Sequence, residues 1–308
     1  MRTVRLEEHI SLIDAETGGI KNFIASYVVK GKQAAIVETG PTSSVQNVLA
    51  GLKELKVSLD EVAYVAVTHI HLDHGGGVGT IIKNLPNARV IVHPNGAPHL
   101  VNPQKLWMQS AQVQGQQLAE LYGEPEPVPA DRIIAVKDGM TFDLGANVGL
   151  RVAETLGHAS HHQSYLETKS HGLFPGDAAG IYFKNLNVVV PTTPAPFRLD
   201  SQLVSLEKLE GLNPKSLFYS HFGRARDAVE KLQAYGEQLK LWVSIAEEGF
   251  QKHMDFDAVQ NAIINRDASV EKVLGVIKDH PILKMTVLNN SVEGVVKYVE
   301  KAHSLAPK

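Results

Sequence analysis

A segment of seven residues, 68–74, constrains this chain most, because it brings four metal-binding side chains together. It reads Thr68-His69-Ile70-His71-Leu72-Asp73-His74. Imidazole and carboxylate are ligands that zinc and similar divalent metals accept, and a hydrolytic site also needs one coordination position open for water. An apolar run, residues 61–67, precedes the segment and is typical of a buried strand, and three glycines follow it and permit a tight turn. The segment therefore predicts a metal site on a loop at the end of a strand.

The H-x-H-x-D-H pattern resembles the signature of the metallo-β-lactamase superfamily. Three later segments resemble further motifs of that family in the expected order: Gly157-His158, Gly176-Asp177 and Ser220-His221-Phe222-Gly223. The resemblance covers about residues 10–225. It implies an α+β fold, the αββα sandwich, in which two sheets pack face to face with helices outside.

The resemblance also implies a site for two divalent metal ions, with zinc expected and iron or manganese as alternatives. The implied ligands are His69, His71 and His158 for the first metal, Asp73, His74 and His221 for the second, and Asp177 as the bridge between them.

Two positions depart from the family pattern. Glu38 stands in the Val37-Glu38-Thr39-Gly40 turn, where the family usually has an aspartate that supports the metal ligands from outside. Leu156 stands where the family often has proline before Gly157-His158. The first departure puts the support of the ligands in question, whereas the second removes a rigid turn residue and no ligand.

The composition of the chain excludes several classes of binding partner and metal site. The chain has 308 residues, a net charge of -3 and no cysteine. It therefore has no basic excess for a nucleic-acid clamp, no disulfide and no thiolate ligand. Acidic residues near the N-terminus argue against a signal peptide, and no apolar run approaches membrane-spanning length. We expect a cytoplasmic protein that acts on a small molecule, without a nucleic-acid or membrane partner.

Short apolar runs between turn residues predict the strands of the sandwich. An early group covers residues 10–13, 23–29 and 34–37, single strands follow at 61–67 and 90–92, and a second β group covers 133–136, 141–144, 150–153, 163–166 and 172–174. Residues 44–56, after the early group of strands, carry apolar side chains at helical spacing and therefore predict a helix.

Two segments fall outside this pattern, so we divide the chain into a sandwich domain, residues 1–223 with an insert at 95–130, and a helical extension, residues 224–308. The insert contains Trp107 and Met108 and ends in three prolines. It is either a cover for the core or a wall over the metal cleft.

In the extension, Ala228, Leu232, Tyr235, Leu239 and Trp242 form one amphipathic face. Further helices are predicted at 257–266 and 291–303, with Asn290 and Glu293 as a capping box for the second. We expect a homodimer that buries Trp107, Met108 or the Leu232, Leu239 and Trp242 face. The alternative is that both segments pack within their own chain.

The implied chemistry is hydrolysis by a hydroxide held between two metals. Asp73 would bind metal and orient this nucleophile, and it is the candidate general acid. Tyr182 is a candidate donor to the carbonyl oxygen of the substrate, or simply an aromatic residue of a strand. His162 has no vacant coordination position to fill, so a supporting role outside the ligand set is favoured.

A metal-dependent hydrolase of esters, lactones or thioesters, active on several substrates, is the favoured function. Residues 157–164 are similar to the same stretch in the lactonase and glyoxalase II branches, but we find no basic cluster of the kind that binds glutathione. Phosphodiester, phosphotriester or β-lactam hydrolysis is the alternative main activity. A mononuclear iron dioxygenase, a flavo-diiron oxidoreductase, an RNA-processing nuclease and a non-catalytic scaffold are further alternatives.

Overall fold

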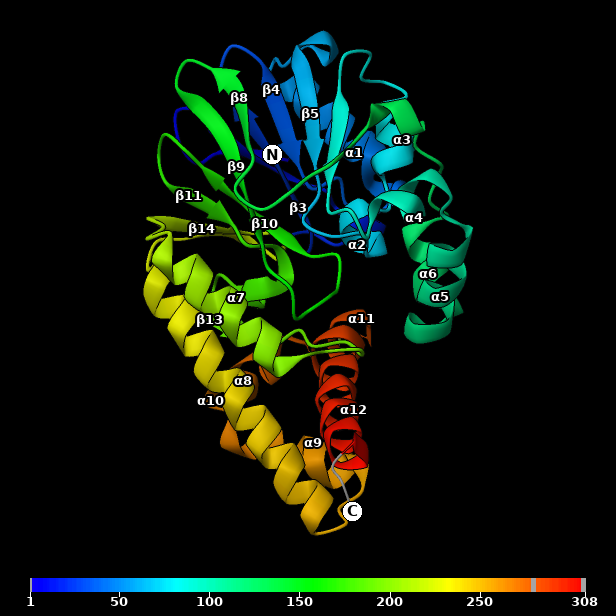
Figure 1. Cartoon of the computed structure of the whole chain (residues 1–308), viewed down its shortest axis with the longest axis vertical. Coiled ribbons are helices and arrows are strands. Elements are labelled where there is room, and N and C mark those ends of the chain that lie inside the picture. The colour runs from blue at the N-terminus through cyan, green and yellow to red at the C-terminus, as the bar shows by residue number, and fades with distance from the viewer. Residues whose placement is uncertain (1, 278–280, 306–308) are drawn as a thin grey trace.

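Two β-sheets face each other at the centre of the structure, with helices on both outer sides (Figure 1). The computed structural model describes residues 2–277 and 281–305. The strands of the first sheet, in spatial order, are β1 (Thr3–Arg5), β2 (Ile10–Asp14), β3 (Ala25–Lys30), β4 (Ala34–Val37), β5 (Val62–Ala66), β6 (Arg89–Val92) and β7 (Ile133–Ala135). Those of the second are β15 (Gly223–Ala225), β14 (Ser216–Tyr219), β11 (Gly172–Phe174), β10 (Gln163–Glu167), β9 (Val148–Glu154) and β8 (Thr141–Gly145). The predicted α+β sandwich is confirmed.

The side chains of β3 point alternately to the two faces of the first sheet, and both faces are covered. Tyr27 and Val29 point into the core between the sheets, whereas Val28 points to the outer core beneath the helices. Successive side chains of a strand point to opposite faces, so an apolar run buries both. Between the sheets, the ring of Phe174 lies 5.2 Å from that of Tyr27 and 5.0 Å from that of Phe218.

Helices of the first half cover the outer face of the first sheet. They are α1 (Val45–Glu54), α3 (Val78–Ile82) and the insert helices α4 (Ala97–Val101), α5 (Gln104–Gln114) and α6 (Gln116–Tyr122). The insert is helical as predicted, and Leu106, Leu118 and Tyr122 are buried in the outer core. Trp107 packs partly against the same core, whereas Met108 is 63% exposed. The insert therefore covers core.

The second sheet is covered by α7 (Leu199–Gly211) and by the extension. The extension consists of α8 (Ala228–Gln251), α9 (Phe256–Arg266), α10 (Ala268–Ile277), α11 (Pro281–Leu283), the π-helical turn η6 (Lys284–Asn289) and α12 (Asn290–Leu305). It lies below the sandwich in Figure 1. Its apolar residues share one core with strand residues such as Leu173 and Leu217, so it is packed on the sandwich rather than separate from it.

The amphipathic face of α8 is buried within the chain, which corrects the prediction that it could form a dimer surface. Leu232, Leu239 and Trp242 are each 0% exposed. The indole Nε1 of Trp242 donates to Oδ2 of Asp267 at 2.8 Å. A side chain with no exposed area cannot also present an apolar patch to another subunit.

Two further sequence-based predictions are wrong in detail. The strand at 133–136 is β7 and pairs with β6 of the first sheet rather than joining the second group. Asn290 has helical backbone angles and continues from η6, so it is not the cap of a new helix. The helix α10 was not predicted. In addition, β15 ends at Ala225, two residues beyond the predicted limit of the sandwich.

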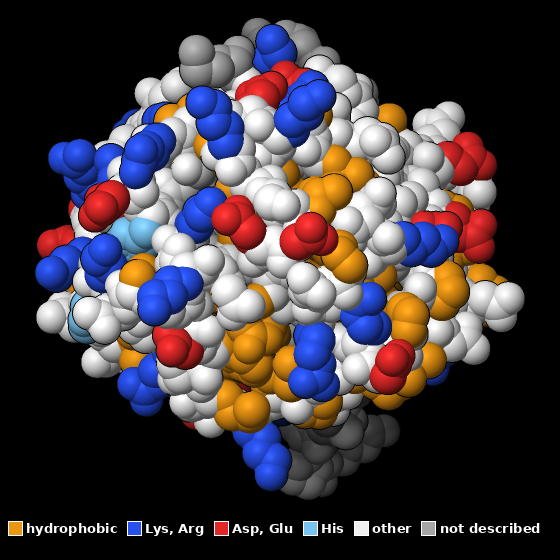
Figure 2. Space-filling model, turned by 90° about the horizontal axis from the view of Figure 1, so that it is seen from above, with side chains coloured by type: hydrophobic (Ala, Val, Ile, Leu, Met, Phe, Trp, Pro, Cys, Tyr) orange, Lys and Arg blue, Asp and Glu red, His pale blue; other side chains and the backbone are white. Residues whose placement is uncertain are grey.

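The end of the sandwich seen in Figure 2 carries both positive and negative charge, because basic and acidic side chains are interspersed there. Among the residues that the structure describes, no helix is long and apolar enough to cross a membrane.

Candidate metal centre

The seven implied ligands meet at the end of the sandwich that faces the extension, on loops that leave the strands. His69 and His71 follow β5, and the short helix α2 (Leu72–Gly75) carries Asp73 and His74. Strands β9, β11 and β14 run in the same direction, because β9 and β11 are both antiparallel to β10 and β14 is parallel to β11. The remaining ligands follow these three strands: His158 after β9, Asp177 in the turn η5 (Gly176–Ala179) after β11, and His221 after β14.

His69, His71 and His158 form one compact group of nitrogen atoms. Nδ1 of His71 lies 2.9 Å from Nε2 of His69 and 3.1 Å from Nε2 of His158. Nδ1 of His158 lies 2.9 Å from the carbonyl oxygen of Thr192, which can only accept a hydrogen bond. Nδ1 therefore carries the proton, and Nε2 offers its lone pair to the group.

Asp73, His74 and His221 form a second group. Nε2 of His221 lies 3.2 Å from Nε2 of His74 and 3.5 Å from Oδ2 of Asp73. Nδ1 of His221 donates to the carbonyl oxygen of Phe23 at 3.0 Å, so its Nε2 also faces inward with a lone pair.

The carboxylate of Asp177 lies between the two groups. Oδ1 is 3.4 Å from Nε2 of His74, and Oδ2 is 3.4 Å from Nε2 of His158. Oδ1 is buried without a hydrogen-bond partner among the described residues. Imidazole lone pairs and carboxylate oxygens gathered in this way fit divalent cations, with Asp177 able to bind in both groups.

Two buried residues hold the ligands from behind. Glu38 accepts from the backbone N–H of Thr68 at 3.2 Å through Oε1, and its Oε2 lies 3.5 Å from Nδ1 of His74. Neither of these two atoms has a hydrogen-bond partner among the described residues, so Glu38 faces His74 as a neighbouring charge at the position where the family usually has aspartate. His162 accepts from the backbone N–H of Asp177 at 3.2 Å through Nε2, which places it outside the ligand set, as expected.

The electrostatics of the site keep the acidic ligands ionised. Burial raises the pKa of Asp73, but His74 and His221 outweigh it and lower the pKa to about 2. Burial also opposes ionisation of Asp177, yet His74 and His158 hold its pKa well below the usual range. Burial lowers the pKa of His69 well below its ordinary value, which keeps that imidazole neutral. Ionised carboxylates and neutral imidazoles are the forms that bind metals. Neighbouring carboxylates outweigh burial and raise the pKa values of His74 and His221, so these two imidazoles release their protons when a metal binds.

Tyr182, the candidate donor to the carbonyl oxygen of the substrate, lines a cavity beside His221, but its hydroxyl is hydrogen-bonded within its own hairpin. It lies in β12 (Ile181–Phe183), which pairs with β13 (Val188–Val190). Its hydroxyl donates to Oδ1 of Asn187 at 2.9 Å, and its ring stacks on Tyr219. Hydrogen bonding to Asn187 occupies the proton that a substrate oxygen would need, so the structure gives this role no support.

Tyr122, at the end of the insert helix α6, also lies near the site, although the sequence pattern did not predict it. Its hydroxyl is buried without a hydrogen-bond partner among the described residues. Burial raises its pKa, and the negative charges of Asp73 and Asp177 add to the effect. An aromatic residue in an insert carries no signal of its own, and only the packing of α6 near α2 places this hydroxyl close to the site.

Comparison with known proteins agrees with this geometry. The family described as the metallo-beta-lactamase superfamily matches residues 20–221. The chain belongs to this superfamily. Membership of this superfamily implies divalent-metal binding, and the chain has His/Asp clusters that could hold such a metal. It also suggests hydrolase activity in general.

Two curated proteins are similar to the chain in sequence. The metallo-beta-lactamase fold-containing protein ST1585 of Sulfurisphaera tokodaii is 30% identical over 215 residues, which are 69% of this chain and 77% of that protein. The lactamase-like protein adaB of Aspergillus niger is 27% identical over 206 residues, 67% of this chain and 51% of that protein.

Solved structures show the fold over most of the chain. The crystal structure of ST1585 from Sulfolobus tokodaii has a TM-score of 0.66 at 24% identity and covers 90% of this chain and 93% of that one. That of the metallo-beta-lactamase family protein TTHA1429 from Thermus thermophilus has a TM-score of 0.63 at 19% identity and covers 92% and 90%.

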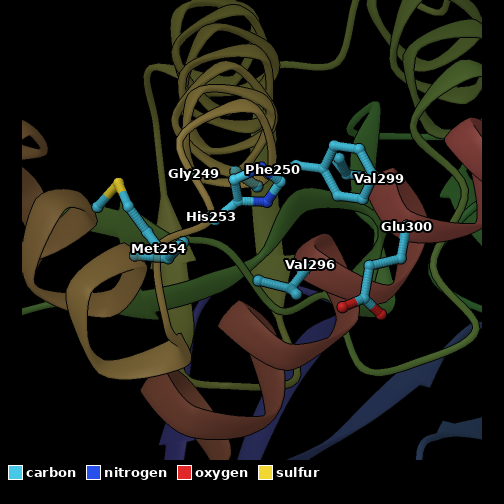
Figure 3. Close-up of a pocket in the computed structure, with 9 residues that line it drawn as sticks. Gly249, Phe250, His253, Met254, Val296, Val299 and Glu300 are labelled. Atoms are coloured by element: carbon cyan, nitrogen blue, oxygen red, sulfur yellow. The ribbon is translucent and has the colours of Figure 1, made fainter.

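A separate hollow of about 220 Å³ lies in the extension, between α8, α9 and α12 (Figure 3). It is lined mainly by apolar side chains such as Phe250, Met254 and Val299. Its titratable side chains, His253 and Glu300, belong to none of the candidate metal-binding groups found in the described part of the chain.

Proposed function

We propose that this protein is a dinuclear metal hydrolase that opens the ester, lactone or thioester bond of small molecules. The observation that carries the proposal is the position of Asp177, whose two oxygens each lie 3.4 Å from a histidine of a different ligand group. A carboxylate placed in this way can join two metal ions that share one reaction centre. Such ions activate water as a nucleophile and polarise the bond to be broken.

The chain contributes orientation and charge. Carbonyl oxygens of Thr192 and Phe23 fix the rings of His158 and His221, so the ligands are held in place before a substrate arrives. The side chain of Asp73 is 16% exposed, compared with 6% for Asp177. Asp73 is therefore the acidic ligand that a substrate meets. Its ionised carboxylate is suited to orient the attacking water, accept a proton from it and pass that proton to the leaving group.

Two observations favour an ester, lactone or thioester as the bond that is cleaved. Residues 157–164 are similar to the lactonase and glyoxalase II stretch, and the cavity beside His221 is lined largely by apolar and aromatic side chains. Such a lining suits the apolar part of a carboxylic ester better than the highly charged backbone of a nucleic acid.

A panel of substrates tests the proposal. The zinc-loaded protein is assayed against a phenyl ester, a γ-lactone, a thioester, a phosphodiester, a phosphotriester and a β-lactam, with the metal-free protein and Asp177→Asn as controls. We expect the highest kcat/KM for a carboxylic ester, lactone or thioester, and loss of turnover in both controls. Turnover that is confined to phosphoesters, or unaffected by metal removal, would contradict the proposal.

A further inference from the structure

A cavity of about 400 Å³ opens directly beside a metal ligand. Its wall includes His221, and three separate parts of the chain complete it: residues 20–23, residues 181–186 of the β12 hairpin, and Val276 and Leu283 of the extension. Phe23 both lines the cavity and accepts the hydrogen bond from Nδ1 of His221. The backbone of Tyr182 is hydrogen-bonded to His221 and Phe222. An occupant of this cavity therefore lies beside His221, one residue of the second ligand group.

The lining is apolar within and basic at the rim. Phe23, Phe183 and Phe222 supply aromatic surface. The charged groups of the lining are Lys21 and Lys184, both on exposed residues, and no aspartate or glutamate of the described chain lines the cavity. Cavities of this size are typical of small-molecule sites.

Two apolar residues of the lining are unusually exposed. Leu186 is 36% exposed and Val276 is 55% exposed. They come from different elements, the β12 hairpin and α10, yet both line the same cavity. Exposed apolar side chains that gather at one hollow are typical of a binding surface.

We propose that this cavity holds an apolar arm of the substrate that ends in an anionic group at Lys21 and Lys184. The preferred substrates are then esters, lactones or thioesters of acids that carry a second, negatively charged end. This inference rests on the proposed hydrolase function and adds the substrate class. It also gives the extension a role in specificity, because Val276 and Leu283 form part of the wall.

The expected effects follow from burial and charge. Each methylene group that enters the apolar lining should raise kcat/KM about threefold until the cavity is full. A terminal anion should add a further factor of roughly two to five for each exposed lysine, and this part should weaken as salt is added.

Matched phenyl esters test the length and the charge separately. The acetyl, butyryl and hexanoyl esters vary the arm, and the monoester of adipic acid and a sulfonate-terminated analogue add an anionic end to the hexanoyl length. We expect kcat/KM to rise along the neutral series and to rise again for both anionic esters. A flat neutral series would overturn the apolar part of the proposal, and equal rates for adipate and hexanoyl esters would overturn the anionic part.

Substitutions locate the effect on this cavity. The double variant Lys21→Glu, Lys184→Glu should reverse the preference for the adipate ester, and Val276→Asp should flatten the neutral series. Lys53→Glu and Val204→Asp are matched controls, since Lys53 lies on α1 and Val204, 63% exposed, lies on α7, and neither lines the cavity. Equal effects of the controls and the cavity variants would overturn the assignment.

A binding measurement separates this inference from the hydrolase itself. Calorimetry on the metal-free protein should show tighter binding of the monoamide of adipic acid, which keeps one terminal carboxylate, than of the neutral hexanamide, and the double lysine variant should lose the difference. Failure of every ester to be hydrolysed by the metal-loaded protein would overturn the proposed function. Equal binding of the adipic monoamide and hexanamide would overturn the anionic subsite, whatever the turnover.

Discussion

Oε2 of Glu38 lies 3.5 Å from Nδ1 of His74, and both side chains are buried. When Nε2 of His74 binds a metal, the remaining proton is on Nδ1 and points to this carboxylate. Glu38 is anchored in turn by the N–H of Thr68 at 3.2 Å. The longer side chain thus reaches from the backbone of Thr68 to the ring of His74 and places a negative charge beside that ring.

Glu38→Gln should weaken metal binding about tenfold or more, because it removes the negative charge that supports His74. Glu38→Asp should also weaken binding, since the shorter side chain cannot span both contacts. Competition with a chromophoric chelator measures the affinity, and Glu61→Gln, an exposed acid paired with Lys30 at 3.0 Å, is the control. Unchanged affinity in both Glu38 variants would show that this contact does not support the site.

Asp73→Ala should remove most of the turnover and leave the fold intact. Asp73 belongs to the second ligand group and lies in no apolar core. We expect a loss of at least about a hundredfold in kcat together with weaker binding of one metal, while circular dichroism and Tm change little. A variant that keeps near wild-type turnover at full metal occupancy would rule out this role for Asp73.

Acid should destabilise the metal-free protein below about pH 6.5. Burial lowers the pKa of His161 to about 4, and burial likewise lowers the pKa of His69 and His162. Between about pH 6.5 and 4 the unfolded chain binds protons that the folded protein excludes, so stability is full above this window and falls as the pH decreases through it.

Two histidines act in the opposite direction. Burial opposes the charge on His74 and His221, but neighbouring carboxylates outweigh it and raise both pKa values. Their contribution is present below about pH 6.5 and is lost as the pH rises. Thermal unfolding of the metal-free protein should show Tm falling from about pH 6.5 to about pH 4.5, with a shallower slope in His161→Asn. A constant or rising Tm over this window would contradict the prediction.

Trp242→Phe should destabilise the protein by about 2 kcal/mol. The change removes the hydrogen bond to Asp267 and leaves a buried acceptor and a gap in the core. Urea unfolding gives the free energy, and Trp107→Phe, on a partly buried residue of the insert, should cost less than about 1 kcal/mol. Equal costs at the two positions would contradict the assignment of Trp242 to the core.

The homodimer stays a prediction, now without α8 as its surface. In the insert, α5 carries two exposed apolar side chains that are candidates for the dimer surface. Met108 is 63% exposed and Val113 is 57% exposed. If light scattering gives a dimeric mass, Met108→Asp should lower it. A monomeric mass across dilution would end the dimer prediction.

The sequence predicted which candidate metal-binding side chains would gather, because a short loop fixes the spacing of four of them. His69, His71, Asp73 and His74 are almost contiguous, so whichever strand precedes them brings all four to one place. The strands that carry the other ligands were also recognised from their apolar runs, and a shared strand direction then places those ligands at the same edge.

Properties that depend on distant packing could not be predicted in the same way. The direction of the Tyr182 hydroxyl depends on Asn187 across the hairpin. A strand at this position allows the hydroxyl to point either to Asn187 or to a substrate. The apolar face of α8 shows that it is buried, but not whether its partner is another helix of the same chain or a second subunit. Pairing of β7 with β6 follows from the path of the insert between them, which apolar periodicity does not determine.

Metal content measured together with turnover tests the central claim most directly. After loading with zinc, manganese or iron and removal of free metal, elemental analysis should give about two metal ions per chain. Turnover should disappear on chelation and return on reloading, and Asp177→Asn should retain about one ion. A wild-type stoichiometry that stays near one ion with every metal would contradict a dinuclear centre bridged by Asp177.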